Sequence, residues 1–131
     1  MAIVLTGCSK IPVGPDCPKL LPRWSEPRDG LGPFRGLVAV GIVGAQPMWD
    51  GQPVDMLELD RRLEFVSKVD PAYHILFDPS GASTCLAATE LRDRINRVAD
   101  CQGAGVCGQG AEEEFIRRRF EDSRTEPGPP E

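Results

Sequence analysis

The chain has 131 residues, room for one domain of ordinary size, and a net charge of −5 at neutral pH. This negative charge argues against a nucleic-acid-binding surface, because such surfaces are basic. The longest apolar run, around Val38–Val43, is about half of the roughly twenty residues that a membrane-spanning helix needs. We expect the folded part to cover about 75–90 residues, because glycine and proline are frequent and the prolines cluster at both ends.

The first eight residues resemble a bacterial lipobox, the signal at which a diacylglyceryl group is attached to a cysteine. In Leu5-Thr6-Gly7-Cys8 small residues precede the cysteine, and an apolar stretch precedes them. A complete signal has a basic region and about 7–15 apolar residues, so residues 1–8 correspond to only part of one. We expect Cys8 to carry a lipid anchor; the alternative is a short apolar N-terminus with an incidental cysteine.

Residues 9–35 are predicted to form a proline-rich linker. Prolines recur there every three to six residues with little apolar periodicity, a pattern that favours extended, polyproline-like chain. We expect Trp24 and the pair Leu20-Leu21 to be only partly ordered; the alternative is that they dock on the domain. Such a linker could hold a folded domain a few tens of ångströms from a membrane surface.

The folded domain is predicted over residues 36–110 and begins with β-structure. A β-branched run bounded by glycine, residues 36–43, indicates a first strand. Two short strands are then expected around the turn Asp50-Gly51, because Asp-Gly between apolar runs is a strong hairpin signal.

Two helices separated by a strand follow the hairpin. Asp55 and Glu58 have the spacing of a capping box, so a helix is predicted from Asp55 to the residues before Pro71. Residues 73–77 are predicted as a strand. A second helix is predicted over residues 84–100, with apolar positions on one face and Ser83 or Thr84 as its N-cap.

Beyond the second helix, which Gly103 is expected to close, the sequence predicts a short strand at residues 105–107. Residues 111–124 are predicted as a charged C-terminal helix, and residues 125–131 as a disordered tail. The expected fold is therefore α+β: a small sheet of four or five strands, two helices packed on one face, and a C-terminal helix.

This order of elements is similar to the soluble domain of the ExbD/TolR family of biopolymer transport proteins. The resemblance lies in Trp49–Val54 (WDGQPV), in Leu57–Leu63 (LELDRRL), and in a strand that closes at Asp78. It covers roughly residues 36–108. The strand at residues 105–107 departs from the family, whose last strand is richer in β-branched residues.

The resemblance implies a cell-envelope protein that works through contacts rather than catalysis. Family members are partners of ExbB/TolQ-type channels, and their proton-bearing aspartate lies in an N-terminal transmembrane helix. The sequence contains neither that helix nor a matching aspartate, so only the periplasmic binding module is implied. The expected partners are envelope proteins, peptidoglycan or a second copy of the chain.

Five cysteines point to disulfides in an oxidising compartment, because lipidation of Cys8 leaves an even number. Cys85 and Cys101 lie sixteen residues apart on one predicted helix, or about 24 Å, whereas a disulfide needs Cα atoms within about 7 Å. A Cys85–Cys107 bond would demand an almost fully extended return of the chain. We therefore favour Cys17–Cys85 with Cys101–Cys107; the alternative is five reduced cysteines in a cytoplasmic chain.

No catalytic residue, metal site or cofactor is predicted. His74 is the only histidine, and Asp78 at a strand end has no second carboxylate beside it in sequence, so loop capping is the expected role of Asp78. Cys101 and Cys107 do not have the spacing of a zinc site. The Gly-rich segments 103–105 and 108–110 lack the GK[ST] ending of a phosphate-binding loop.

Three hypotheses on function remain open. The first is a lipid-anchored, non-catalytic envelope module that acts through protein or cell-wall contacts. The second is a structural domain of unrelated fold that shares only the order of elements. The third is a small enzyme, which would require a deep pocket around His74 and Asp78.

Overall fold

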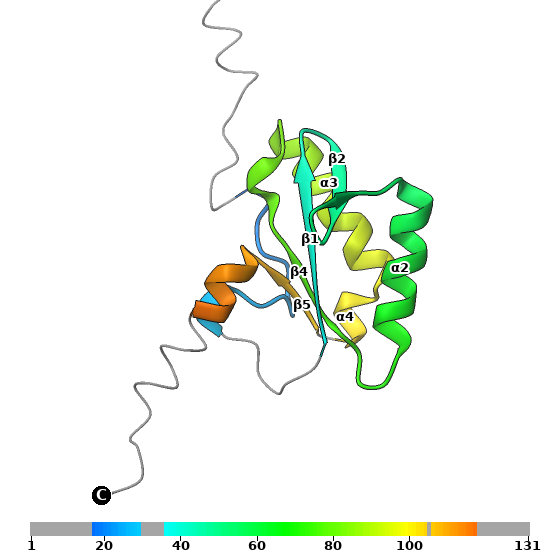
Figure 1. Ribbon diagram of the computed structural model, residues 1–131. Coiled ribbons are helices and arrows are strands. Elements are labelled where there is room, and N and C mark those ends of the chain that lie inside the picture. The colour runs from blue at the N-terminus through cyan, green and yellow to red at the C-terminus, as the bar shows by residue number, and fades with distance from the viewer. Residues whose placement is uncertain (1–16, 30–35, 105, 118–131) are drawn as a thin grey trace, which may run out of the picture.

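Figure 1 shows the computed structural model, which describes residues 17–29, 36–104 and 106–117. A five-stranded sheet has the strand order β3-β2-β1-β4-β5. Its strands are β1 Leu37–Val43, β2 Gln46–Trp49, β3 Gln52–Pro53, β4 His74–Phe77 and β5 Cys107–Gln109. The pairs β1–β2 and β2–β3 are antiparallel, whereas β1–β4 and β4–β5 are parallel. The predicted α+β class is confirmed.

Helices lie on both sides of this sheet. Those after the hairpin are α2 Met56–Lys68, α3 Cys85–Val98 and α4 Cys101–Ala104, with 3-10 turns η1 Pro27–Asp29 and η2 Pro79–Gly81. In Figure 1, α2 and α3 lie side by side against the sheet. Residues 112–117 form a C-terminal helix (orange), which lies on the other side, next to β5. The predicted residues 118–124 of this helix and the tail lie outside the described residues.

Local signals in the sequence set most element boundaries. Asp50 and Gly51 both have positive φ (48° and 86°), as the tight hairpin turn requires. The Asp55 carboxylate accepts a hydrogen bond from the Glu58 amide at 2.8 Å, and so caps α2. Thr84 caps α3 in the same way. All three signals were predicted.

Two boundaries near the end of the domain differ from the prediction. Asp100 adopts a left-handed conformation (φ 52°), so α3 ends at Val98. A separate short helix, α4, follows and contains Gly103, which therefore does not close α3. The last strand is Cys107–Gln109 instead of residues 105–107, because Cys107 is the residue that pairs with Ile75 of β4.

The hydrophobic core lies between the sheet and the helices α2 and α3. Val38, Val40 and Ile42 alternate along β1 and are all buried. The parallel register places Ile75 beside Val38 and Phe77 beside Val40, so β4 extends the same apolar face. On the helix side, the core is completed by side chains of α2 and α3, namely Leu59, Leu63, Val66, Leu91 and Ile95.

Residues 17–29, which we call the strap, pack against the domain. Trp24 is only 4% exposed and belongs to the core cluster, so the expectation that it is partly ordered is wrong. Its indole N–H donates to the Asn96 side chain at 3.0 Å, which satisfies the polar end of a buried ring. Ser25 exchanges backbone hydrogen bonds with Cys107 and Gln109 along the outer edge of β5.

Two disulfides hold these parts together in the pairing that the sequence favoured. Cys17 is joined to Cys85, with Cα atoms 5.7 Å apart, and this bond ties the strap to the start of α3. Cys101 is joined to Cys107, with Cα atoms 5.6 Å apart, and this bond ties α4 to β5.

One ion pair joins the two long helices. The Arg94 guanidinium donates two hydrogen bonds to the Asp60 carboxylate, each 2.7 Å long. This bidentate geometry is the strong form of an arginine–carboxylate pair. The hydrogen bond from Arg94 holds the pKa of Asp60 below its ordinary value, and the positive charges of Arg94 and Arg97 act in the same direction.

We predict that Asp60→Asn removes an acid-sensitive contribution to stability. A lowered pKa in the folded state means that the contribution is complete above the unfolded pKa of about 3.9 and is lost as the pH falls through the folded value. The free energy of unfolding in urea should fall by about 1 kcal/mol at pH 7, and the deficit should shrink below pH 4. Glu64→Gln, on the exposed face of α2, is the control. A deficit of equal size at pH 7 and pH 3 would contradict this assignment.

Candidate functional site

The face of the sheet that points away from α2 and α3 is covered over only half its width. The C-terminal helix covers the side formed by β4 and β5, where Phe115 is fully buried. A Cβ atom at Gly108 would lie only 3.0 Å from the Phe115 ring, so glycine in β5 makes room for this aromatic side chain. No helix among the described residues covers the side formed by β1 and β2.

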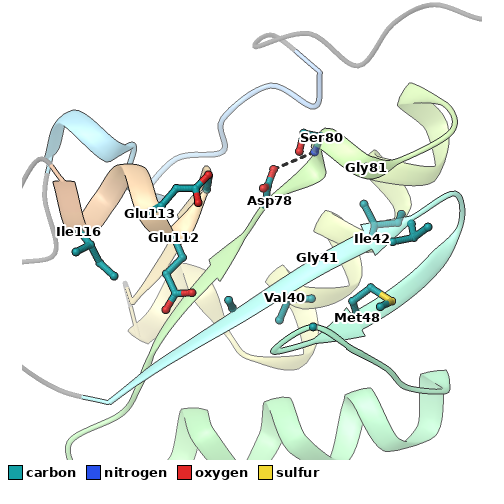
Figure 2. A pocket seen from close by; sticks show the side chains of 14 residues that line it. Val40, Gly41, Ile42, Met48, Asp78, Ser80, Gly81, Glu112, Glu113 and Ile116 are labelled. Atoms are coloured by element: carbon teal, nitrogen blue, oxygen red, sulfur yellow. Dashed lines mark hydrogen bonds between the residues drawn. The ribbon is translucent and has the colours of Figure 1, made fainter.

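A hollow of about 590 Å³ lies over this uncovered part, and we call it the sheet-face groove. Residues 39–43 of β1 line its floor together with Met48 from β2, and of these β1 residues Ala39, Gly41 and Val43 alternate with the core residues Val40 and Ile42. The turn η2 borders it at one side and the C-terminal helix at another (Figure 2). Its lining includes Ala39, Gly41, Val43, Met48, Asp78, Glu112 and Glu113.

Every ionisable side chain that lines the groove is acidic. Glu112 and Glu113 come from the first turn of the C-terminal helix, and Asp78 follows β4. No ion pair neutralises these three carboxylates within the described residues. The groove therefore combines an apolar floor with a negatively charged rim.

Asp78 has the capping role that the sequence predicted. Its carboxylate accepts a hydrogen bond from the Ser80 amide at 3.0 Å, drawn as a dashed line in Figure 2. One carboxylate oxygen thus organises η2, while the residue still borders the groove. This turn is packed tightly, because a Cβ at Gly81 would lie 2.1 Å from the Ile42 carbonyl oxygen.

At Gly41, in contrast, no described residue requires a glycine. Its φ is not positive, and a Cβ built on it would lie 3.8 Å from the nearest atom, the Cβ of Met48, which is an ordinary contact distance. Glycine in the middle of a strand weakens it, and it often marks a place where a ligand or another backbone approaches closely. A larger side chain would fit at position 41, so the groove is deeper there than the packing of the described residues requires.

The remaining predicted residues lie apart from the groove. His74 begins β4 and Asp78 follows the end of the same strand; the groove is lined by Asp78 but not by His74. Cys8 lies outside the described residues. Within the described part of the chain, no three histidine, cysteine, aspartate or glutamate side chains are placed to hold a metal ion.

A second, smaller hollow of about 310 Å³ lies on the outer side of α2. Trp49 and Phe65 line it, and the Arg62 guanidinium lies 5.6 Å from the centre of the Trp49 ring. Glu58 pairs with Arg61 at 3.4 Å and with Arg62 at 2.9 Å, so the charges at this hollow are largely matched. It lacks the uncompensated charge of the groove.

The groove was not predicted from the sequence. One signal was present: in the first strand the bulky residues Val38, Val40 and Ile42 alternate with the small residues Ala39 and Gly41. That alternation gives the strand one face of large side chains, which pack in the core, and an opposite face of small side chains, which forms the groove floor. The position of the C-terminal helix, which decides how much of the shallow face stays open, has no local signal.

Comparison with known proteins returned no relative: no protein-family model, no curated protein and no solved structure matches the chain.

We predict that Gly41→Val makes the domain more stable. The new Cβ would make an ordinary van der Waals contact with Met48 at the floor of the groove, and valine has a higher preference than glycine for the extended backbone of a strand. The free energy of unfolding in urea should rise by about 0.5–1 kcal/mol. Gly81→Ala is the matched control and should be strongly destabilised by the clash at Ile42. A loss of stability in Gly41→Val would show that the floor is filled in the free protein.

Proposed function

We propose that the chain is a non-catalytic binding module of the bacterial cell envelope. It acts through contacts with envelope proteins or peptidoglycan and resembles the soluble domain of ExbD/TolR proteins. The observation that carries the proposal is the sheet-face groove, a surface that combines an apolar floor with a rim of carboxylates. The resemblance contributes the order of elements, from a hairpin through two helices to a short last strand.

The two disulfides support a location outside the cytoplasm. Disulfides form and persist in oxidising compartments, and this domain uses four of its cysteines in two of them. No helix among the described residues is long and apolar enough to span a bilayer. A lipid on Cys8 would attach the domain to a membrane surface through residues 9–16.

The character of the groove supports binding in preference to catalysis. Its polar groups are Asp78, Ser80 and two glutamates, and none of the carboxylates is held beside a histidine, cysteine or lysine that lines the same hollow. Acid–base and nucleophilic mechanisms that use histidine, cysteine or lysine need such a group within hydrogen-bonding reach of its partner. An apolar floor with a rim of one charge is a surface suited to recognition.

We predict that a photo-crosslinking amino acid at Val43 captures a partner in cells that export the protein. Val43 is 63% exposed at the border of the groove. The adduct should appear in the envelope fraction, either as a protein conjugate or bound to isolated cell-wall sacculi. The same amino acid at Glu64, on the exposed side of α2, is the control and should give little adduct.

The crosslinks should also depend on the groove floor. Adding Gly41→Val to the Val43 variant should reduce the adduct about tenfold, because the partner can no longer approach β1 closely. Equal yields at Val43 and Glu64, or no adduct from Val43, would contradict the proposed function.

We further predict that Cys8→Ser moves the protein from the membrane fraction to the soluble fraction. Loss of the thiol removes the attachment point of the lipid and leaves the disulfide-bonded domain intact. The measurement is fractionation together with metabolic labelling by palmitate, with Ser9→Ala as control. If the Cys8→Ser protein still sediments with membranes, the lipid anchor is wrong.

A further inference from the structure

We propose that the sheet-face groove binds an extended, cationic peptide segment of a partner protein. The segment would place apolar side chains on the floor along β1 and lysine or arginine side chains at the acidic rim. This inference rests on the proposed function, since it names the kind of partner that the binding module recognises.

The shape of the floor fits an extended chain. Ala39, Gly41 and Val43 alternate along one face of β1, so their positions are about 7 Å apart. An extended peptide repeats its side chains on one face with the same spacing. The missing side chain at Gly41 leaves room for a bulkier apolar side chain of the peptide at the middle of the groove.

The charge of the rim selects a cationic segment. Asp78, Glu112 and Glu113 line the groove without a basic partner among the described residues. A bound segment would displace water from the apolar floor and lower the local dielectric constant, which strengthens its attraction to these carboxylates. The whole chain carries a net charge of −5, so an acidic segment would be repelled both locally and at long range.

The edges of the sheet are poorly suited to a partner strand, which leaves the open face. The outer strand β3 has only two residues, and one of them, Pro53, has no N–H to donate. The edge of β5 is already paired with Ser25 of the strap. The parallel pair β1–β4 belongs to a class of sheet that is normally covered on both faces, and here one face of β1 is not.

A second copy of this chain is a poorer occupant. A twofold contact through the groove would bring Asp78, Glu112 and Glu113 of one copy against the same carboxylates of the other, because such an interface is self-complementary. Like charges would then meet over an apolar floor. A segment with lysine or arginine meets the opposite charge instead.

The test uses the oxidised full-length chain and two fluorescein-labelled synthetic peptides. One alternates valine and lysine, and the other alternates valine and glutamate. Fluorescence anisotropy should give binding of the valine–lysine peptide at least about tenfold tighter, and weaker at higher salt. Amide chemical shifts in NMR spectra should change at Ala39, Gly41 and Ser80.

Variants assign the contributions of charge and shape. The double variant Glu112→Gln, Glu113→Gln should weaken the valine–lysine peptide about tenfold and reduce its salt dependence. Gly41→Val should weaken it about tenfold while the fold becomes more stable, so unfolding would not explain the loss. Glu64→Gln, outside the groove, should leave binding unchanged.

Several outcomes would overturn the inference. Two concern affinity: equal affinity for both peptides, or no binding of the valine–lysine peptide at about 1 mM. The other two are amide chemical-shift changes confined to α2, and a dimer in sedimentation equilibrium that Gly41→Val abolishes. If the peptide fails while crosslinking at Val43 succeeds, the cationic segment is wrong and the binding module stands. If both fail, the proposed function falls as well.

Discussion

The alternation of large and small side chains along β1 is the constraint on which this structure depends. β1 is the central strand, and its Val38, Val40 and Ile42 fill the core beneath α2 and α3. Because successive side chains of a strand point to opposite faces, Ala39, Gly41 and Val43 are committed to the other face. A shift of register by one residue would exchange the two faces, so the packed core also determines where the shallow floor of the groove lies.

Much of the fold follows from local patterns. The hairpin turn at Asp50-Gly51 and the caps Asp55 and Thr84 each act within a few residues, and all three were predicted. The observed disulfide pairing is the one that the sequence favoured, although helix geometry by itself excluded only Cys85–Cys101. Where interactions between residues close in sequence decide the structure, the sequence alone predicts it.

The features that the sequence did not predict depend on contacts between distant residues. Trp24 is buried because it meets Asn96, which lies 72 residues further along the chain. A proline-rich composition gives no indication of this contact, so the strap was interpreted as a linker. The groove depends in the same way on where the C-terminal helix packs, which the contact of Phe115 with Gly108 fixes.

The strap and the disulfides stabilise the fold and so offset the smaller burial of apolar surface on the open face of the sheet. A sheet covered on both faces buries two apolar layers, whereas in the described part of this chain the second layer is buried only beneath the C-terminal helix. By the chain-entropy description, a bond across the 68 residues between Cys17 and Cys85 stabilises the fold by about 4 kcal/mol, and one across the 6 between Cys101 and Cys107 by about 2 kcal/mol. These covalent contributions act on the strap, on α3, on α4 and on β5, and none of the four cysteines lines the groove. The shallow floor and its carboxylates can therefore remain open to a partner without being needed to hold the domain together.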